Sequence, residues 1–176
     1  MRLPPGGGAA TGLALVVMAG LLECSLRARE LPGEDFGRWQ RALQHCRILS
    51  TPSGTGPPRQ ESCSVLRLDQ QLEGLLTVRF LLPGGERPSL DRQLVFAGVL
   101  EEDSPGMRCR MSRCVPRWPL RLRVSAVGQT GYGATAAAME LTRAQLATGS
   151  CRLEAREVVC EAVGPAGERW RAEASP

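Results

Sequence analysis

The segment of the chain richest in chemically active side chains is residues 108–123, RCRMSRCVPRWPLRLR, which holds six arginines and no acid. Guanidinium groups in a fixed array bind sulfate or phosphate in bidentate fashion, and they displace counterions from a polyanion. The alternative is that these arginines only solvate an outer face and pair with the acidic run 101–103. The segment predicts an anion-binding surface formed by Arg108, Arg110, Arg113, Arg121 and Arg123.

Cysteines are the second group of reactive side chains. Apart from Cys24 there are six of them, an even number that is typical of a disulfide framework in a small secreted domain. Zinc is a poor alternative, because Cys151 and Cys160 are much further apart than the paired cysteines of a zinc site. The spacing favours bridges between Cys46 and Cys63, Cys109 and Cys114, and Cys151 and Cys160, although six cysteines allow other pairings.

Residues 1–28 indicate a signal peptide, because an early Arg2 precedes the continuous apolar run 13–22. A mitochondrial transit sequence is the alternative, but it would be amphipathic and this run is not periodic. We therefore expect residues 29–176 to form a single secreted, extracellular domain without a membrane span. Cleavage after Cys24 or Ala28 leaves a monomer with six cysteines, whereas cleavage after Ala19 keeps Cys24 and permits a disulfide-linked dimer.

The composition excludes several kinds of enzyme. All 22 basic residues are arginine, the formal net charge is +4, and neither lysine nor asparagine occurs. The chain therefore has no Schiff-base lysine and no acceptor for an N-linked glycan. His45 is the only histidine, so a metal site with two histidine ligands is impossible. We expect no catalytic residue, metal or cofactor, and no nucleic-acid binding, because aromatic residues that could stack on bases are scarce.

The elements that position these residues are predicted to form an α+β fold. Phe36, Trp39, Leu43 and Cys46 share one face of a helix that Asp35 would cap, with His45 partly exposed near its end. A Pro/Gly-rich loop at 50–60 follows, and after it the apolar period changes to two, most clearly in LRLRVSAV at 120–127. These patterns predict an N-terminal helix followed by an antiparallel, disulfide-stabilised sheet.

A glycine turn provides an alternative function. Gly128, Gly131 and Gly133 stand between a strand-like segment and the helix-favouring run 135–149, the order used by dinucleotide-binding folds. GQTGYG resembles the glycine turn of some NAD-dependent reductases, although its spacing is G-x-x-G-x-G. The primary hypothesis is a secreted, non-enzymatic protein that binds an extracellular protein or a sulfated polysaccharide (a glycosaminoglycan). The alternative is a small nucleotide-binding or redox protein.

Overall fold

The structure is a computed structural model that describes residues 36–83, 92–130 and 143–176. All of the described residues belong to one compact unit, Pro32–Pro176. The predicted signal peptide and the capping residue Asp35 lie outside the described residues.

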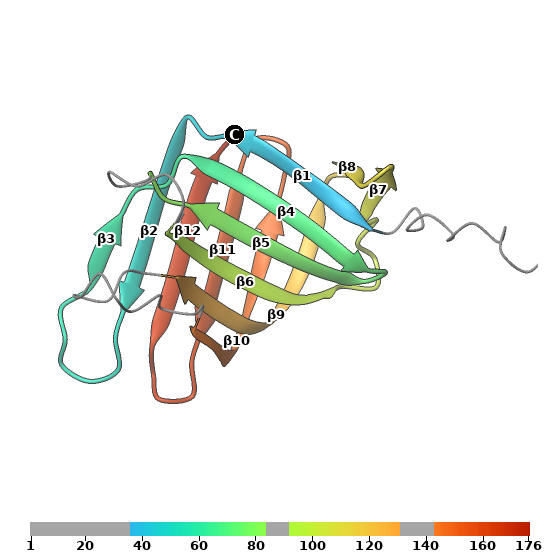
Figure 1. The fold of residues 1–176 in the computed structure, drawn as a ribbon. Helices are drawn as coiled ribbons and strands as arrows, with labels where there is room; N and C mark the ends of the chain where they lie inside the picture. Colours follow the sequence, from blue (N-terminus) through green and yellow to red (C-terminus); the bar gives the residue numbers. More distant parts are fainter. Residues whose placement is uncertain (1–35, 84–91, 131–142) are drawn as a thin grey trace, which may run out of the picture. The chain divides into compact units, whose positions relative to one another are not determined.

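The described residues form a single twelve-stranded sheet and contain no helix (Figure 1). The fold is therefore all-β, and the predicted α+β class is wrong. The strands are β1 (Gly37–Ala42), β2 (His45–Thr51), β3 (Arg59–Glu61), β4 (Val65–Leu72), β5 (Leu75–Leu81), β6 (Gln93–Leu100), β7 (Met107–Arg110), β8 (Arg113–Pro116), β9 (Leu120–Thr130), β10 (Arg143–Leu153), β11 (Val158–Val163) and β12 (Arg169–Ser175).

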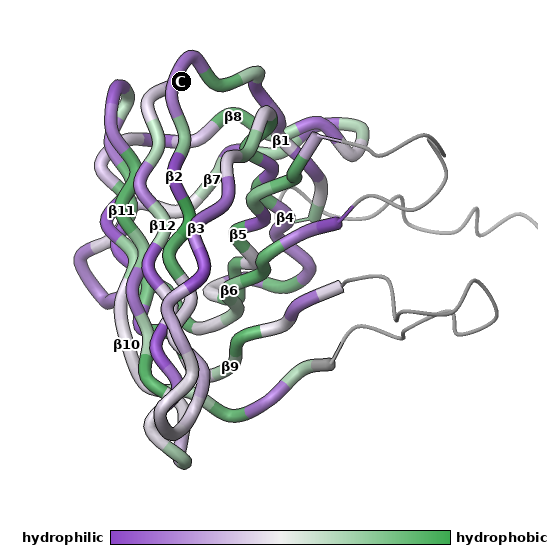
Figure 2. The backbone as a smooth tube through the Cα atoms, turned by 90° about the vertical axis from the view of Figure 1, so that its left-hand side faces the viewer, coloured by the Kyte–Doolittle hydropathy of each residue, from purple (hydrophilic) through white to green (hydrophobic). Residues whose placement is uncertain are grey.

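The order of the strands in the sheet is β3-β2-β12-β11-β10-β9-β6-β5-β4-β1-β8-β7. Neighbours are antiparallel except β1 and β8, which makes the sheet mixed. The sheet curls so that β2, β12, β11 and β10 face β1, β4, β5 and β6 (Figure 2). Consecutive strands β1 and β2 pair with different neighbours, β4 and β12, and the two residues between them hydrogen-bond the ends of different segments. The N–H of Leu43 donates to Ser64 and the N–H of Gln44 to Ser175.

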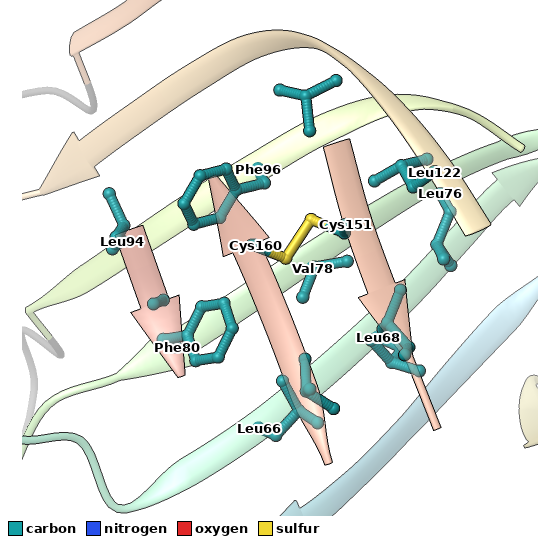
Figure 3. Close-up of a cluster of buried hydrophobic side chains, with 14 of the residues drawn as sticks. Leu66, Leu68, Leu76, Val78, Phe80, Leu94, Phe96, Leu122, Cys151 and Cys160 are labelled. Atoms are coloured by element: carbon teal, nitrogen blue, oxygen red, sulfur yellow. A yellow bond between two sulfur atoms is a disulfide. The ribbon is translucent and has the colours of Figure 1, made fainter. Parts of the chain in front are cut away.

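The hydrophobic core fills the space between the two halves of the curled sheet. Alternate residues of β4, β5 and β6 point inward and meet the Cys151–Cys160 disulfide of β10 and β11 (Figure 3). Phe80 and Phe96 meet edge to face, with 6.0 Å between their ring centroids. Period-two alternation thus gives β4 an apolar inner face and an outer face with Arg67 and Asp69, whereas the outer face of β6 also carries apolar residues, among them Val95 and Val99.

The predicted N-terminal helix is replaced by β1 and β2. Side chains alternate along β1, where Trp39 packs against the core while Arg38 and Gln40 are exposed. Phe36, the first residue of the expected apolar helical face, is 42% exposed. His45 is an exposed residue at the start of β2 rather than at a helix end. The helical spacing of apolar residues was coincidental, because pairing with β4 and β12 satisfies the backbone of this segment.

The glycine turn also differs from the expectation where it is described. Gly128 lies inside β9, between Val95 of β6 and Ala144 of β10, and it is buried. Residues 143–149 of the expected helix belong to β10, which runs antiparallel to β9. A dinucleotide-binding unit needs parallel strands joined by a crossover helix, so this strand pair differs from it. Gly131 and Gly133 lie outside the described residues.

Candidate anion-binding surface

Three of the predicted anion-binding arginines lie on the β7–β8 hairpin. Arg108, Arg110 and Arg113 are exposed, whereas Cys109 and Cys114 point inward and form a disulfide between the two strands. The two residues of the turn, 111 and 112, both have positive φ, at 49° and 63°. This backbone matches the right-handed twist of a two-residue hairpin. The tight turn and the bridge hold the arginines in a defined place.

The sheet register joins this hairpin to further arginines. Arg110 pairs with Arg113, Arg113 is the parallel partner of Arg38 on β1, and Arg38 is opposite Asp69 on β4. In the next row, residue 40 of β1 is opposite Arg67 of β4, which is opposite residue 79 of β5. Cross-strand partners point to the same side of a sheet. We call the resulting set the arginine face: Arg38, Arg67, Arg79, Arg108, Arg110 and Arg113.

Asp69 is the only acid on the five strands β1, β4, β5, β7 and β8. Its carboxylate accepts a hydrogen bond from Nε of Arg38 at 2.7 Å and another from Nε of Arg79 at 2.8 Å. Arg79 also donates to Gln93, which fixes its position. One carboxylate thus hydrogen-bonds two guanidinium groups but neutralises the charge of only one of them. The arginine face therefore keeps a strong excess of positive charge.

Arg121 and Arg123 do not belong to the arginine face. Both are exposed on β9, and Arg121 lies 4.0 Å from the carboxylate of Asp103. Arg123 is opposite Val99 of β6, which is in turn opposite Leu75 of β5. Val99 and Leu75 are both exposed and apolar, so the cross-strand neighbours of Arg123 on this side carry no charge. The cross-strand neighbours within the arginine face, in contrast, include charged residues. The five arginines predicted from the sequence therefore divide into two groups.

On the outer side of β2, β11 and β12, Arg47 and Arg171 are paired with acids instead. Glu173 binds Arg47 at 2.9 Å and Arg171 at 2.7 Å, and Arg171 also approaches Glu161 at 3.5 Å. Hydrogen bonds from Arg47 and Arg171 lower the pKa of Glu173 below its ordinary value. Two acids thus serve two arginines here, in contrast to the arginine face.

Sequence reasoning missed Arg38, Arg67 and Arg79. The signal was present for the last two, because VLRLDQQL and LLTVRFL alternate apolar and polar residues and place these arginines on the outer side. No local signal connects them to the hairpin, because the contact between β8 and β1 joins segments that are far apart in the chain.

The expectation of a disulfide framework is confirmed. The bridges are Cys46–Cys63, Cys109–Cys114 and Cys151–Cys160, the same pairs that the spacing suggested. In the described part of the chain, no three His, Cys, Asp or Glu side chains lie close enough to hold a metal ion. None of its segments is a helix with the length and apolarity needed to cross a membrane.

No family model matches the chain, and no curated protein or solved structure shows significant similarity to it.

Proposed function

We propose that the protein is a secreted, non-enzymatic binding protein whose arginine face takes up a sulfated polysaccharide. The observation that carries the proposal is the sheet register, which continues the arginines of the β7–β8 hairpin with those of β1, β4 and β5 around a single acid. Guanidinium groups recognise sulfate through paired N–H donors as well as through charge.

An extended polyanion fits this surface better than a small anion does. The arginines lie on the outer side of a sheet whose neighbouring strands are separated by about 4.8 Å, so the charges form rows rather than a closed pocket. A polymer with sulfates at intervals engages several such groups at once and releases counterions from each contact. An acidic protein surface has the same charge but not the repeating sulfates, and the experiment below separates the two.

Secretion is part of the proposal, and the disulfides support it. Three intramolecular bridges are compatible with an oxidising, extracellular environment. Mass spectrometry of protein from the culture medium should find an N-terminus close to residue 29 and no alkylatable thiol. Protein that remains inside the cell with reduced cysteines would contradict this part of the proposal.

The binding test compares elution from heparin with elution from a sulfonate cation exchanger at one pH. We expect the wild type to leave heparin at the higher salt concentration. Arg110→Gln with Arg113→Gln should lower the heparin elution salt and reduce the slope of log affinity against log salt by roughly two, about one for each lost contact. The matched control is Arg121→Gln with Arg123→Gln, which removes the same charge from β9.

A larger effect of the hairpin variant than of the control supports recognition by the arginine face. Equal effects of the two variants would mean that the net charge alone governs binding, and equal elution of the wild type from both columns would reject sulfate recognition. Binding to an acidic protein without binding to heparin would favour a protein partner. Neither variant should change the melting temperature appreciably, because exposed arginines contribute little to stability.

A further inference from the structure

A cavity of about 720 Å³ opens at one end of the curled sheet. Its lining comes from both of the facing halves that Figure 2 shows. Ile48 of β2 and Trp170 of β12 contribute from one half, and Leu94 of β6 and Val127 of β9 from the other, and all four are buried core residues. Cavities of roughly 300 to 1,000 Å³ with an apolar floor are the usual size for small-molecule sites.

One oxygen of a partly buried carboxylate on the lining of this cavity lacks a hydrogen-bond partner. Glu168 directly precedes β12, and its Oε2 is buried and has no hydrogen-bond partner in the described part of the chain. A side chain at Gly164 would place its Cβ 2.6 Å from this oxygen and 3.1 Å from the indole ring of Trp170. The carboxylate and the aromatic ring thus lie close to each other beside Gly164. A buried polar atom without a hydrogen bond is costly, so a donor brought by a ligand would be favoured there.

The remaining charges around the cavity do not neutralise this carboxylate. Arg92 forms an ion pair with Glu61 across the rim, so those two charges cancel. Arg59 also lines the cavity, but it is exposed on the edge strand β3 and does not hydrogen-bond Oε2 of Glu168. A carboxylate attracts a cation through its charge, and a neighbouring aromatic ring adds to this attraction where the cation lies over the ring.

We propose that this cavity binds a small apolar molecule that carries a protonated amine. The amine contacts the carboxylate of Glu168 and the ring of Trp170, and the apolar body lies on Ile48, Leu94 and Val127. The terminal torsion of a glutamate side chain is soft, so rotation of the carboxylate can turn an oxygen toward the amine. The site shares no residue with the arginine face, so either can be wrong without affecting the other.

Calorimetric titration of the intact, disulfide-bonded protein tests this with three probes of one shape: 4-phenylbutylamine, 4-phenylbutanol and 4-phenylbutyrate. We expect the amine to bind roughly tenfold more tightly than the alcohol or better, because a hydrogen bond to a charged group is worth about 1.5 to 3 kcal/mol. The carboxylate probe, 4-phenylbutyrate, should bind most weakly. Glu168→Gln should reduce amine affinity roughly tenfold or more and leave alcohol binding unchanged. The control Glu154→Gln removes an exposed carboxylate outside the cavity and should leave the affinity for all three probes unchanged.

Absence of binding by all three probes at millimolar concentration would overturn the proposal. So would equal affinity for amine and carboxylate, or an unchanged amine affinity in Glu168→Gln. Loss of alcohol binding together with amine binding would show that Glu168 supports the cavity without recognising the cation, which also rejects the proposed role. If Glu168→Gln does not fold, the ranking of the three probes on the wild type decides the question.

Discussion

Replacing Cys151 and Cys160 together with alanine should lower the free energy of unfolding by about 4 to 5 kcal/mol. The two cysteines are cross-strand partners separated by nine residues in sequence. Closing a loop of that length lowers the conformational entropy of the unfolded chain, which stabilises the folded state by about 2.6 kcal/mol. Both are almost fully buried, at 2% and 0% exposure, in the cluster that Figure 3 shows. Removing two buried groups of about methylene size adds about 2 kcal/mol of lost transfer and cavity energy.

The Cys46–Cys63 bridge provides the comparison. Its sequence separation of 17 corresponds to about 3.1 kcal/mol by the same loop-closure relation, which is more than for Cys151–Cys160. Cys46 is only partly buried, so deleting its sulfur removes less packing. Loop length alone therefore ranks the Cys46–Cys63 bridge as the more stabilising of the two, and burial reverses that ranking.

Equilibrium unfolding in urea, followed by tryptophan fluorescence, measures both double-alanine variants against the wild type. The urea concentration at the unfolding midpoint should fall further for the Cys151/Cys160 variant. The slope of the unfolding free energy against urea concentration shows whether the denatured state has changed as well. The reasoning is refuted if the Cys46/Cys63 variant loses more stability. It is also refuted if the Cys151/Cys160 variant loses less than about 3 kcal/mol, because burial of the sulfurs would then contribute nothing.

Two further predictions concern the backbone and the charge network. Gly98→Ala should lower the free energy of unfolding by more than about 2 kcal/mol, because its Cβ would lie 2.0 Å from the carbonyl oxygen of Arg123. Gly54→Ala should lower it by only about 1 kcal/mol, because the new Cβ meets open space and only the positive φ is unfavourable. Thermal melts in which the two variants lose the same stability would contradict this. Arg47→Gln should raise the pKa of Glu173 toward its ordinary value, as measured by NMR titration of that carboxyl, because a hydrogen bond from Arg47 is the largest cause of its lowering. Since the folded pKa of Glu173 is lowered, the stability it contributes is present above the pKa of the unfolded chain and is lost as the pH falls through the folded value; an unchanged pKa in Arg47→Gln would refute the assignment.

Patterns within single segments determined a substantial part of this protein. The alternation at 120–127 correctly indicated a strand with one buried face, and β9 includes these residues. The cysteines at 109 and 114 and at 151 and 160 are directly opposite one another on neighbouring strands, a relation that short spacing favours. The composition also excluded lysine chemistry and sites with several histidines without any structure. These features depend on residue identity or on neighbours in sequence, so they can be read locally.

Only the tertiary structure decided the rest. Residues 36–46 have a helical apolar spacing, yet they become two strands because β4 and β12 supply their backbone partners from far along the chain. The same long-range pairing places Arg113 beside Arg38 and leaves Arg121 on another part of the sheet. Side-chain alternation tells which face of a strand is polar, but not which strand lies next to it. The arginine face and the cavity with Glu168 are both products of that choice of neighbours, and for this reason the segment 108–123 predicted only the hairpin part of the face and no segment predicted the cavity.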